Sequence, residues 1–259
     1  KVIKGKNKNS KIINYEIVEK ATGEISAGAG VGTDGGSILF GVKENNYLGK
    51  GLSVNANATI ASDTLKGNFS VINPNFNNSD KSVFLNIKAE ETDKLKDFGY
   101  KTNKTGLGLG TSFEYLKDFN LGLSLSSFIE KMETDSTASA SQQKQKGNYF
   151  DTFLKLNFDY DKRNQKFKTT NGFRSYYSID LPLISETNTL SNSYNYKVFN
   201  EFYENDITTF SIFISSANSV SNEDIKLSER LFIPPKKLRG FESGKVGPKD
   251  GNDFIGGNY

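Results

Sequence analysis

The feature that most restricts the fold is a strict alternation of apolar and polar residues over long runs. In LGLSLS, residues 121–126, every leucine is followed by a glycine or a serine. Side chains of a β-strand point to opposite faces in turn, so such a run forms a strand with one apolar and one polar face. The pattern recurs in residues 52–62 and 149–161, and no convincing helical period is present. The sequence therefore predicts an all-β protein.

These runs predict twelve strands joined mostly by short turns. Lys117-Asp118 is one of the turn signals between neighbouring runs, which are typical of consecutive antiparallel hairpins. Two longer links lack the alternation: the polar residues 133–148, expected to form an exposed flexible loop, and residues 220–254. The expected strands are residues 11–19, 24–33, 37–45, 52–62, 64–73, 82–91, 104–116, 119–132, 149–161, 172–183, 194–204 and 208–219.

Consecutive two-faced hairpins favour a sheet that closes into a barrel, because closure leaves no unpaired strand edge. In a soluble barrel or sandwich the apolar face would form the core. In a membrane barrel the apolar face would meet lipid, and the polar face would line the lumen. Most runs span roughly 9–13 residues, whereas soluble strands centre near 5–6 and a tilted membrane strand needs about 9–11. Strand length therefore favours the membrane barrel.

Composition excludes several classes of function. The 259 residues include no cysteine and no histidine, which removes thiol and imidazole catalysis, the usual zinc ligands and a Ser-His-Asp triad. The 33 basic and 30 acidic residues nearly balance, with a net charge of +3, so a nucleic-acid partner is not expected. No apolar run reaches the about 18 residues of a helical membrane span, and no signal segment is visible.

Five short motifs occur in a defined order along the chain. The most specific is LRGF, residues 238–241, followed by GPKDGNDFIGGNY, residues 247–259. The weaker motifs are KIINYEIVEKATGEISAGAGVGTDGG (11–36), ENNYLGKG (44–51), NPNF (73–76) and DKRNQKFKTTNG (161–172). With these motifs the chain resembles the C-terminal barrel of the BamA family of outer-membrane assembly factors, in the wider surface-antigen superfamily of POTRA-plus-barrel proteins.

The resemblance implies the domain organisation. Residues 1–22 are expected to be the C-terminal tail of a periplasmic POTRA domain. Residues 23–259 are expected to form an antiparallel transmembrane β-barrel that is truncated before its closing strands, with about eleven of an expected sixteen strands. Residues 220–254 would fold back into the lumen, and residues 256–259 would start the next strand. The chain would therefore be a fragment of the family's barrel.

The resemblance also implies a function without bond chemistry, the insertion and folding of β-barrel proteins in the bacterial outer membrane. Outer-membrane lipids, unfolded client barrels and assembly lipoproteins would be the partners, and no cofactor or metal is implied. Leu238, Arg239, Gly240 and Phe241 would form the motif of the infolded loop. The planar guanidinium of Arg239 suits a bidentate bond to a carboxylate, expected beyond Tyr259.

Gly28, Gly30 and Gly32 lie in the expected first barrel strand. Glycine weakens a strand because it has no side chain to pack and loses more entropy on ordering. These glycines would either loosen a lateral seam of the barrel or simply allow close packing, and the sequence leaves both interpretations open. A hairpin rather than a helix follows them, which excludes a dinucleotide-binding turn.

Asp161, Arg163 and Gly172 match a strand-end motif of the family, for which the resemblance implies a structural role. Among carboxylates close in sequence, Glu90 and Glu91 point to opposite faces of a strand. Acid–base catalysis is therefore not expected.

The sequence leaves three alternatives open. A two-partner-type translocation pore of the same superfamily would share the LRGF loop. A passive porin would use a constriction loop but would lack POTRA domains. A soluble β-protein would turn the apolar face of its sheet inward.

Overall fold

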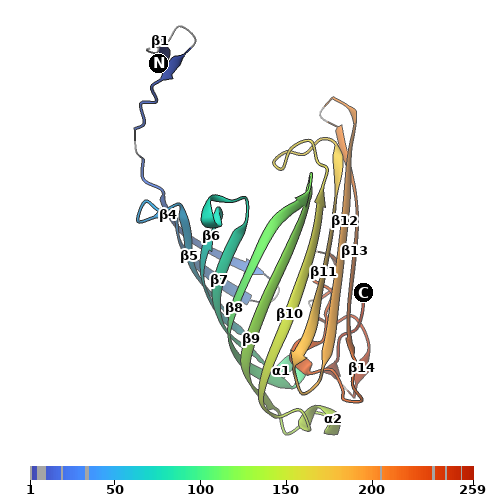
Figure 1. The fold of residues 1–259 in the computed structure, drawn as a ribbon. Helices are drawn as coiled ribbons and strands as arrows, with labels where there is room; N and C mark the ends of the chain where they lie inside the picture. Colours follow the sequence, from blue (N-terminus) through green and yellow to red (C-terminus); the bar gives the residue numbers. More distant parts are fainter. Residues whose placement is uncertain are drawn as a thin grey trace.

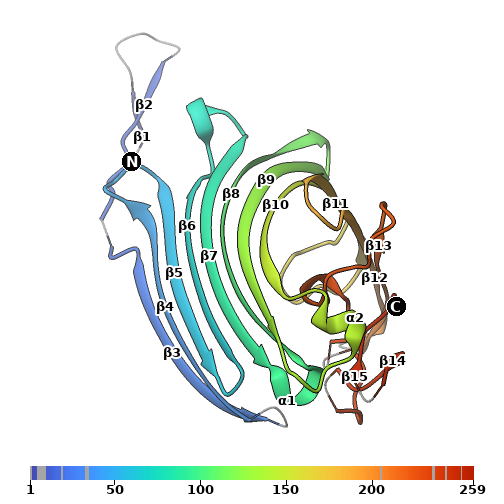
Figure 2. The same ribbon diagram turned by 90° about the horizontal axis from the view of Figure 1, so that it is seen from below.

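An eleven-stranded antiparallel sheet makes up most of the described chain (Figure 1). The structure is a computed structural model that describes residues 2–4, 10–18, 20–32, 35–204, 206–234, 237–242, 244–251 and 253–259. The sheet runs in chain order from β3 (Gly23–Gly32) to β13 (Asp206–Ser219), so each neighbouring pair is a hairpin. It curls into a C-shaped wall whose edges are β3 and β13 (Figure 2).

The eleven runs predicted between residues 24 and 219 are all strands of this sheet, with ends shifted by a few residues. The predicted strand 11–19 is shorter, because only β2 (Lys11–Ile13) is a strand, paired with β1 (Val2–Lys4). Residue 19 lies outside the described residues. The remaining elements are β4 Gly35–Tyr47, β5 Leu52–Ala61, β6 Thr64–Asn73, β7 Ser82–Lys94, β8 Tyr100–Leu116, β9 Phe119–Thr134, β10 Gly147–Asp161, β11 Gly172–Ile184, β12 Thr189–Tyr203, β14 Lys249–Asp250, β15 Asp253–Phe254, α1 Leu95–Phe98, α2 Ala140–Gln143, η1 Phe76–Asn78 and η2 Leu227–Glu229.

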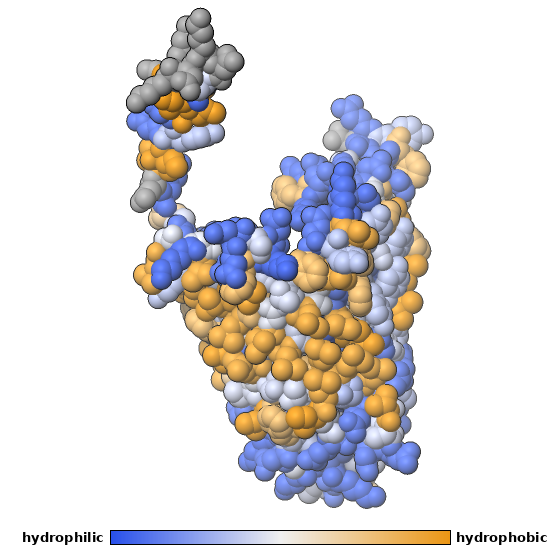
Figure 3. Space-filling view, in the orientation of Figure 1, coloured by the Kyte–Doolittle hydropathy of each residue, from blue (hydrophilic) through white to orange (hydrophobic). Residues whose placement is uncertain are grey.

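The polar face of the sheet is its concave face. Ser124 is 7% exposed on that side, whereas its neighbour Leu123 is 45% exposed on the convex side. The outward apolar side chains form a belt across the middle of the molecule, between polar ends (Figure 3). Among the described residues no helix is long and apolar enough to cross a membrane. The outward apolar face contradicts the soluble alternative, which needs that face inside.

The prediction that residues 133–148 form an exposed loop is right only in part, because the segment joins β9 to β10 with several exposed residues but is anchored by buried ones. This segment, called the α2 loop below, contains α2, and Ser139 caps that helix. The Ser139 hydroxyl accepts the N–H of Gln142, and the Gln142 side chain accepts the N–H of Ser139. Gln142 and Gln145 are buried. The Ser-x-x-Gln pattern of a capping box was visible in the sequence, but the burial depends on contacts with residues that follow β13.

Residues 220–254, called the lid segment below, pass from the end of β13 to the concave side of the sheet and contain η2, β14 and β15. The chain then returns to the sheet edge. The N–H of Tyr259 donates to the carbonyl of Ser215 in β13 at 2.9 Å, and the Ser215 N–H donates back to Tyr259. This reciprocal pair is the hydrogen-bonding unit of an antiparallel ladder, and it lies where the sequence predicts the start of a further strand.

Candidate functional site

Lys226, at the start of the lid segment, is a fully buried lysine. Its ammonium group donates to the Asp151 carboxylate of β10 and lies 3.4 Å from Glu130 Oε2 of β9. A third carboxylate, Glu229 Oε1 of η2, lies 3.2 Å away. Lys226, Glu130 and Asp151 are each 0% exposed. The lid segment is therefore joined to two strands of the wall by charge pairs that exclude water.

Strand alternation explains how the wall provides these carboxylates. In the register of β9 and β10, Glu130 lies opposite Tyr149, and Asp151 lies one inward position further along β10. Both carboxylates therefore point to the concave side. The Tyr149 ring centre lies 4.8 Å from the Lys226 ammonium, within cation–π range. Lys104 of β8 approaches Glu130 at 3.6 Å, so three neighbouring strands contribute to the cluster.

The electrostatics of the cluster keep Lys226 charged. Burial alone lowers the pKa of a lysine, because the ammonium loses its water. The carboxylates of Glu229, Asp151 and Glu130 act in the opposite direction and prevail, so the pKa of Lys226 is raised above its usual value. In the described part of the chain no group of His, Cys, Asp or Glu is arranged to hold a metal ion. The carboxylates of this cluster are instead arranged around an ammonium group.

Apolar packing reinforces the charge pairs. Leu227, the residue after Lys226, is buried and packs with Phe98, Tyr100 and Met132 at the α1 end of the wall. The ring of Phe232, further along the lid segment, meets Phe98 edge to face, with ring centres 5.1 Å apart. Each fully buried side chain of this size stabilises the packed state by about 1.5–3 kcal/mol. The start of the lid segment is thus fixed by both charge and packing.

The α2 loop holds the lid segment at two places. Gln145 Oε1 accepts the backbone N–H of Leu227 at 2.8 Å. Near the other end of the lid segment, the hydroxyls of Ser139 and Ser141 donate to the Asp250 carboxylate. These hydrogen bonds stabilise the ionised form and lower the pKa of Asp250. The α2 loop therefore joins both ends of the lid segment to the wall.

The LRGF motif lies in the lid segment but takes no part in the Lys226 cluster. Arg239 is exposed, and no hydrogen bond or ion pair joins it to another residue that the structure describes. Phe241 is also exposed. Gly240 has a positive φ of 86°, a conformation that favours glycine. The carboxylate partner of Arg239 was expected beyond Tyr259, so its pairing stays a prediction.

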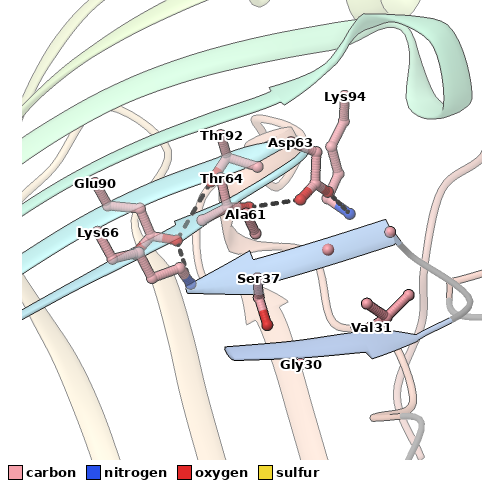
Figure 4. Close-up of a pocket in the computed structure, with 12 residues that line it drawn as sticks. Gly30, Val31, Ser37, Ala61, Asp63, Thr64, Lys66, Glu90, Thr92 and Lys94 are labelled. Carbon is pink, nitrogen blue, oxygen red and sulfur yellow. Dashed lines mark hydrogen bonds and ion pairs between the residues drawn. The ribbon is translucent and has the colours of Figure 1, made fainter. Parts of the chain in front are cut away.

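The glycines of the concave face are of two kinds. A Cβ atom at Gly106 of β8 would collide with the Phe128 ring, so glycine is required there for packing. A Cβ atom at Gly28 of β3 would meet nothing within 4 Å, and one at Gly30 would meet only the Ser37 hydroxyl, at 3.7 Å (Figure 4). Close packing within the described sheet therefore does not explain Gly28 and Gly30. The seam role of these glycines stays a prediction.

Asp161, Arg163 and Gly172 come together at the turn between β10 and β11. Arg163 donates to Asp161 through Nε at 2.8 Å and through Nη2 at 2.7 Å, a bidentate pair that is mostly shielded from solvent. Gly172 has a φ of 99°, and a Cβ atom there would collide with the carbonyl of Lys162. Only glycine fits at this position.

Sequence reasoning missed Lys226 and its two carboxylates on the wall. The only signal for Glu130 and Asp151 was that strand alternation turns a charged side chain inward. Nothing in the residues around Lys226 marks it, because a lysine in a polar segment is usually solvated. Its partners lie 96 and 75 residues earlier in the chain.

A family model described as the Omp85 superfamily domain matches residues 46–259. The chain belongs to the Omp85 superfamily. The match covers the sheet from the end of β4 onward together with the lid segment and the Lys226 cluster. Omp85 members are outer-membrane β-barrel proteins, in agreement with the outward apolar belt.

A solved structure shows the same fold for the whole Omp85 chain. It is the crystal structure of BamA from Haemophilus ducreyi lacking POTRA domains 1–3. The TM-score is 0.84 at 20% sequence identity, and the match covers 100% of this chain and 55% of that chain. This chain therefore spans about half the length of that structure. The prediction of an antiparallel transmembrane β-barrel with the fold of the BamA barrel, incomplete in these residues, is confirmed.

The Lys226 cluster leads to a prediction. Lys226→Met should leave the buried Asp151 carboxylate without its cation and Glu130 with only Lys104, and breaking such a buried pair costs about 3–5 kcal/mol. We expect the lid segment to be cleaved much faster in limited proteolysis of the folded barrel. Lys144→Ala, at an exposed lysine of the α2 loop, is the matched control and should leave the cleavage rate unchanged.

The double variant Lys226→Met/Asp151→Asn removes the carboxylate that Lys226→Met leaves without a cation, and it should recover part of the protection. Equal cleavage rates for Lys226→Met and the wild type would show that the cluster does not hold the lid segment.

Proposed function

We propose that this chain belongs to a factor that inserts and folds β-barrel proteins in the bacterial outer membrane, with β3 as its lateral seam. The observation that carries the proposal is how few side chains β3 can offer to a partner strand. Its large apolar side chains are Ile25 and Val31, and both belong to the outward face of the strand. Gly28 and Gly30 add no side-chain contact to the strand.

Membrane physics connects this edge with the proposed activity. In hydrocarbon each unsatisfied backbone N–H or C=O costs several kcal/mol, so an edge strand needs a partner. An incoming client strand has the same need, and addition of that strand to β3 satisfies both. Cross-strand side-chain pairs contribute roughly 0.2–1 kcal/mol each. Because β3 makes few of them, its partner can be exchanged at low cost.

The proposal also covers the domain organisation, the position of the lid segment and the partners. Residues 1–22 form the tail of a periplasmic POTRA domain, residues 23–259 lie in the outer membrane, and the lid segment stays inside the lumen. The partners are outer-membrane lipids, unfolded client barrels and assembly lipoproteins. No bond is made or broken in this function, and no cofactor takes part.

The translocation pore is the alternative within the same superfamily. It would move a partner through the lumen, so the lid segment would have to leave the concave side. That movement would break the Lys226 cluster and the Leu227 packing. Insertion at a lateral seam leaves both in place, which favours the assembly function. The Omp85 match stands against a passive porin.

A disulfide across the seam tests the proposal. The chain has no cysteine, so engineered pairs give a clean result. In the complete protein, a disulfide from residue 28 to the closing strand should block client insertion because β3 can no longer exchange its partner. Reductant should restore insertion, measured as heat-modifiable folded client.

The matched control is Asn57→Cys/Asn68→Cys, which joins directly opposed residues of β5 and β6 and should leave insertion unchanged. Insertion at the wild-type rate with the seam locked would rule out β3 as the gate.

The Arg239 proposal has its own test. Arg239→Lys keeps the positive charge but loses the bidentate fork. We expect faster proteolysis of the lid segment near residue 239 and lower assembly activity. Lys237→Arg, a change that keeps the charge at an exposed neighbour, should have no effect. Wild-type protection and activity in Arg239→Lys would mean that a positive charge suffices.

A further inference from the structure

The motif GPKDGNDFIGGNY, residues 247–259, folds back on itself. Its middle forms the hairpin of β14 and β15. The N–H of Ile255 donates to the carbonyl of Pro248 at 3.0 Å, and a Cβ atom at Gly257 would lie 3.4 Å from the Pro248 ring. The Gly-Pro start of the motif therefore lies beside its Gly-Gly end, which explains why the two occur at this spacing.

The Gly-Gly end also closes the chain on itself around the lid segment. The N–H of Gly257 donates to the carbonyl of Leu231 at 2.8 Å. The chain between these two residues carries the LRGF motif and is called the LRGF loop below. It leaves and returns at one point, made by Leu231, Gly256 and Gly257 and called the neck. Closure of the neck holds the ends of the loop together against the chain entropy that separates them.

Gly256 is the residue of the neck that tolerates no side chain. It is buried, its φ is 70°, and a Cβ atom there would collide with the Leu231 carbonyl oxygen. That oxygen is the acceptor for Gly257, so a side chain at Gly256 would push the acceptor away and open the neck. Gly251, in the β14–β15 hairpin, has nearly the same φ of 62°, but a Cβ atom there would meet nothing within 4 Å. The collision therefore sets Gly256 apart, not the positive φ.

The neck lies between two parts of the chain that are held firmly. On one side, Leu231 directly follows the residues that the Lys226 cluster and its apolar packing fix to the wall. On the other side, the Asn258 side chain accepts the N–H of the buried Ala217 in β13 at 2.9 Å. The neck thus joins the base of the lid segment to β13.

We propose that Gly256 is a positioning residue, which keeps the neck closed and so fixes the LRGF motif inside the lumen. This inference rests on the proposed function, in which the lid segment stays in the lumen. With the neck open, the Lys226 cluster would still hold the start of the lid segment, and the α2 loop would still hold Asp250 near the end of the LRGF loop. The two ends of the loop could then separate, and the motif between them would lose its fixed place on the concave side.

Limited trypsin digestion of the complete folded barrel tests the neck, because trypsin cleaves the LRGF loop and the base of the lid segment at different residues. Arg239 and Lys245 lie in the loop, and Arg230 lies in the base. Gly256→Ala should raise the cleavage rate after Arg239 and Lys245 roughly tenfold, since overpacking weakens the closed state. The cleavage rate after Arg230 should not change, because the Lys226 cluster still holds the base.

Gly251→Ala is the matched control. It adds the same methyl group at nearly the same φ but in open space, so it should leave all three cleavage rates nearly unchanged. A disulfide provides the rescue. In the Gly256→Ala background, Leu231→Cys/Gly257→Cys joins the two sides of the neck covalently and should restore slow cleavage of the LRGF loop. Reductant should abolish that protection.

If Gly256→Ala does not fold, as judged by heat-modifiable migration, Asn258→Ala decides, because it releases the neck from β13. Unchanged cleavage of the LRGF loop in the folded variant would overturn the proposal. Equal acceleration by Gly251→Ala would also overturn it, because the strain of a positive φ would then explain the effect. Faster cleavage of the loop with client insertion at the wild-type rate would support the neck and count against a role of the LRGF motif in the proposed function, so the two can fail separately.

Discussion

Backbone hydrogen bonding in a medium without water is the constraint on which this structure depends. Every strand must have its N–H and C=O groups paired within the membrane, so the strands follow one another as hairpins and no connection crosses the sheet. The constraint leaves two edges to be dealt with. At β13 the returning chain begins to pair through Tyr259. At β3 the strand that completes the pairing is not among the described residues, and the proposed function rests on exchange of that partner.

The lid segment is held to the wall by buried contacts, whereas β3 makes few side-chain contacts. Lys226 joins the lid segment to β9 and β10 through buried charge pairs, and removal of either partner would leave an uncompensated charge. These charge pairs therefore oppose partial release of the lid segment from the wall. β3 carries glycines that touch little and apolar residues that face outward. Under the proposed function, a barrel whose lumen segment is held firmly and whose seam at β3 is held loosely can open sideways without emptying its lumen.

The sequence predicts the strands well because their signal is local. Alternation, strand length and turn residues are all present within about ten residues, and the eleven barrel strands follow from them. The Lys226 cluster could not be predicted, because its members become neighbours only after hairpins bring β9 and β10 beside the lid segment. The α2 loop could be predicted only in part. Its capping box was readable, but its burial depends on Asp250 and Leu227, far along the chain.

Amide hydrogen exchange of the complete protein in a lipid bilayer measures how firmly β3 and the lid segment are held, because it reports the local opening free energy of each strand. We expect residues 24–32 to exchange much faster than β9 and β10. Residues 225–232 should be protected almost as well as those two strands, since Lys226 and Leu227 hold them to the wall. Exchange in β3 as slow as in β9 and β10 would show that β3 is not a loosely held strand.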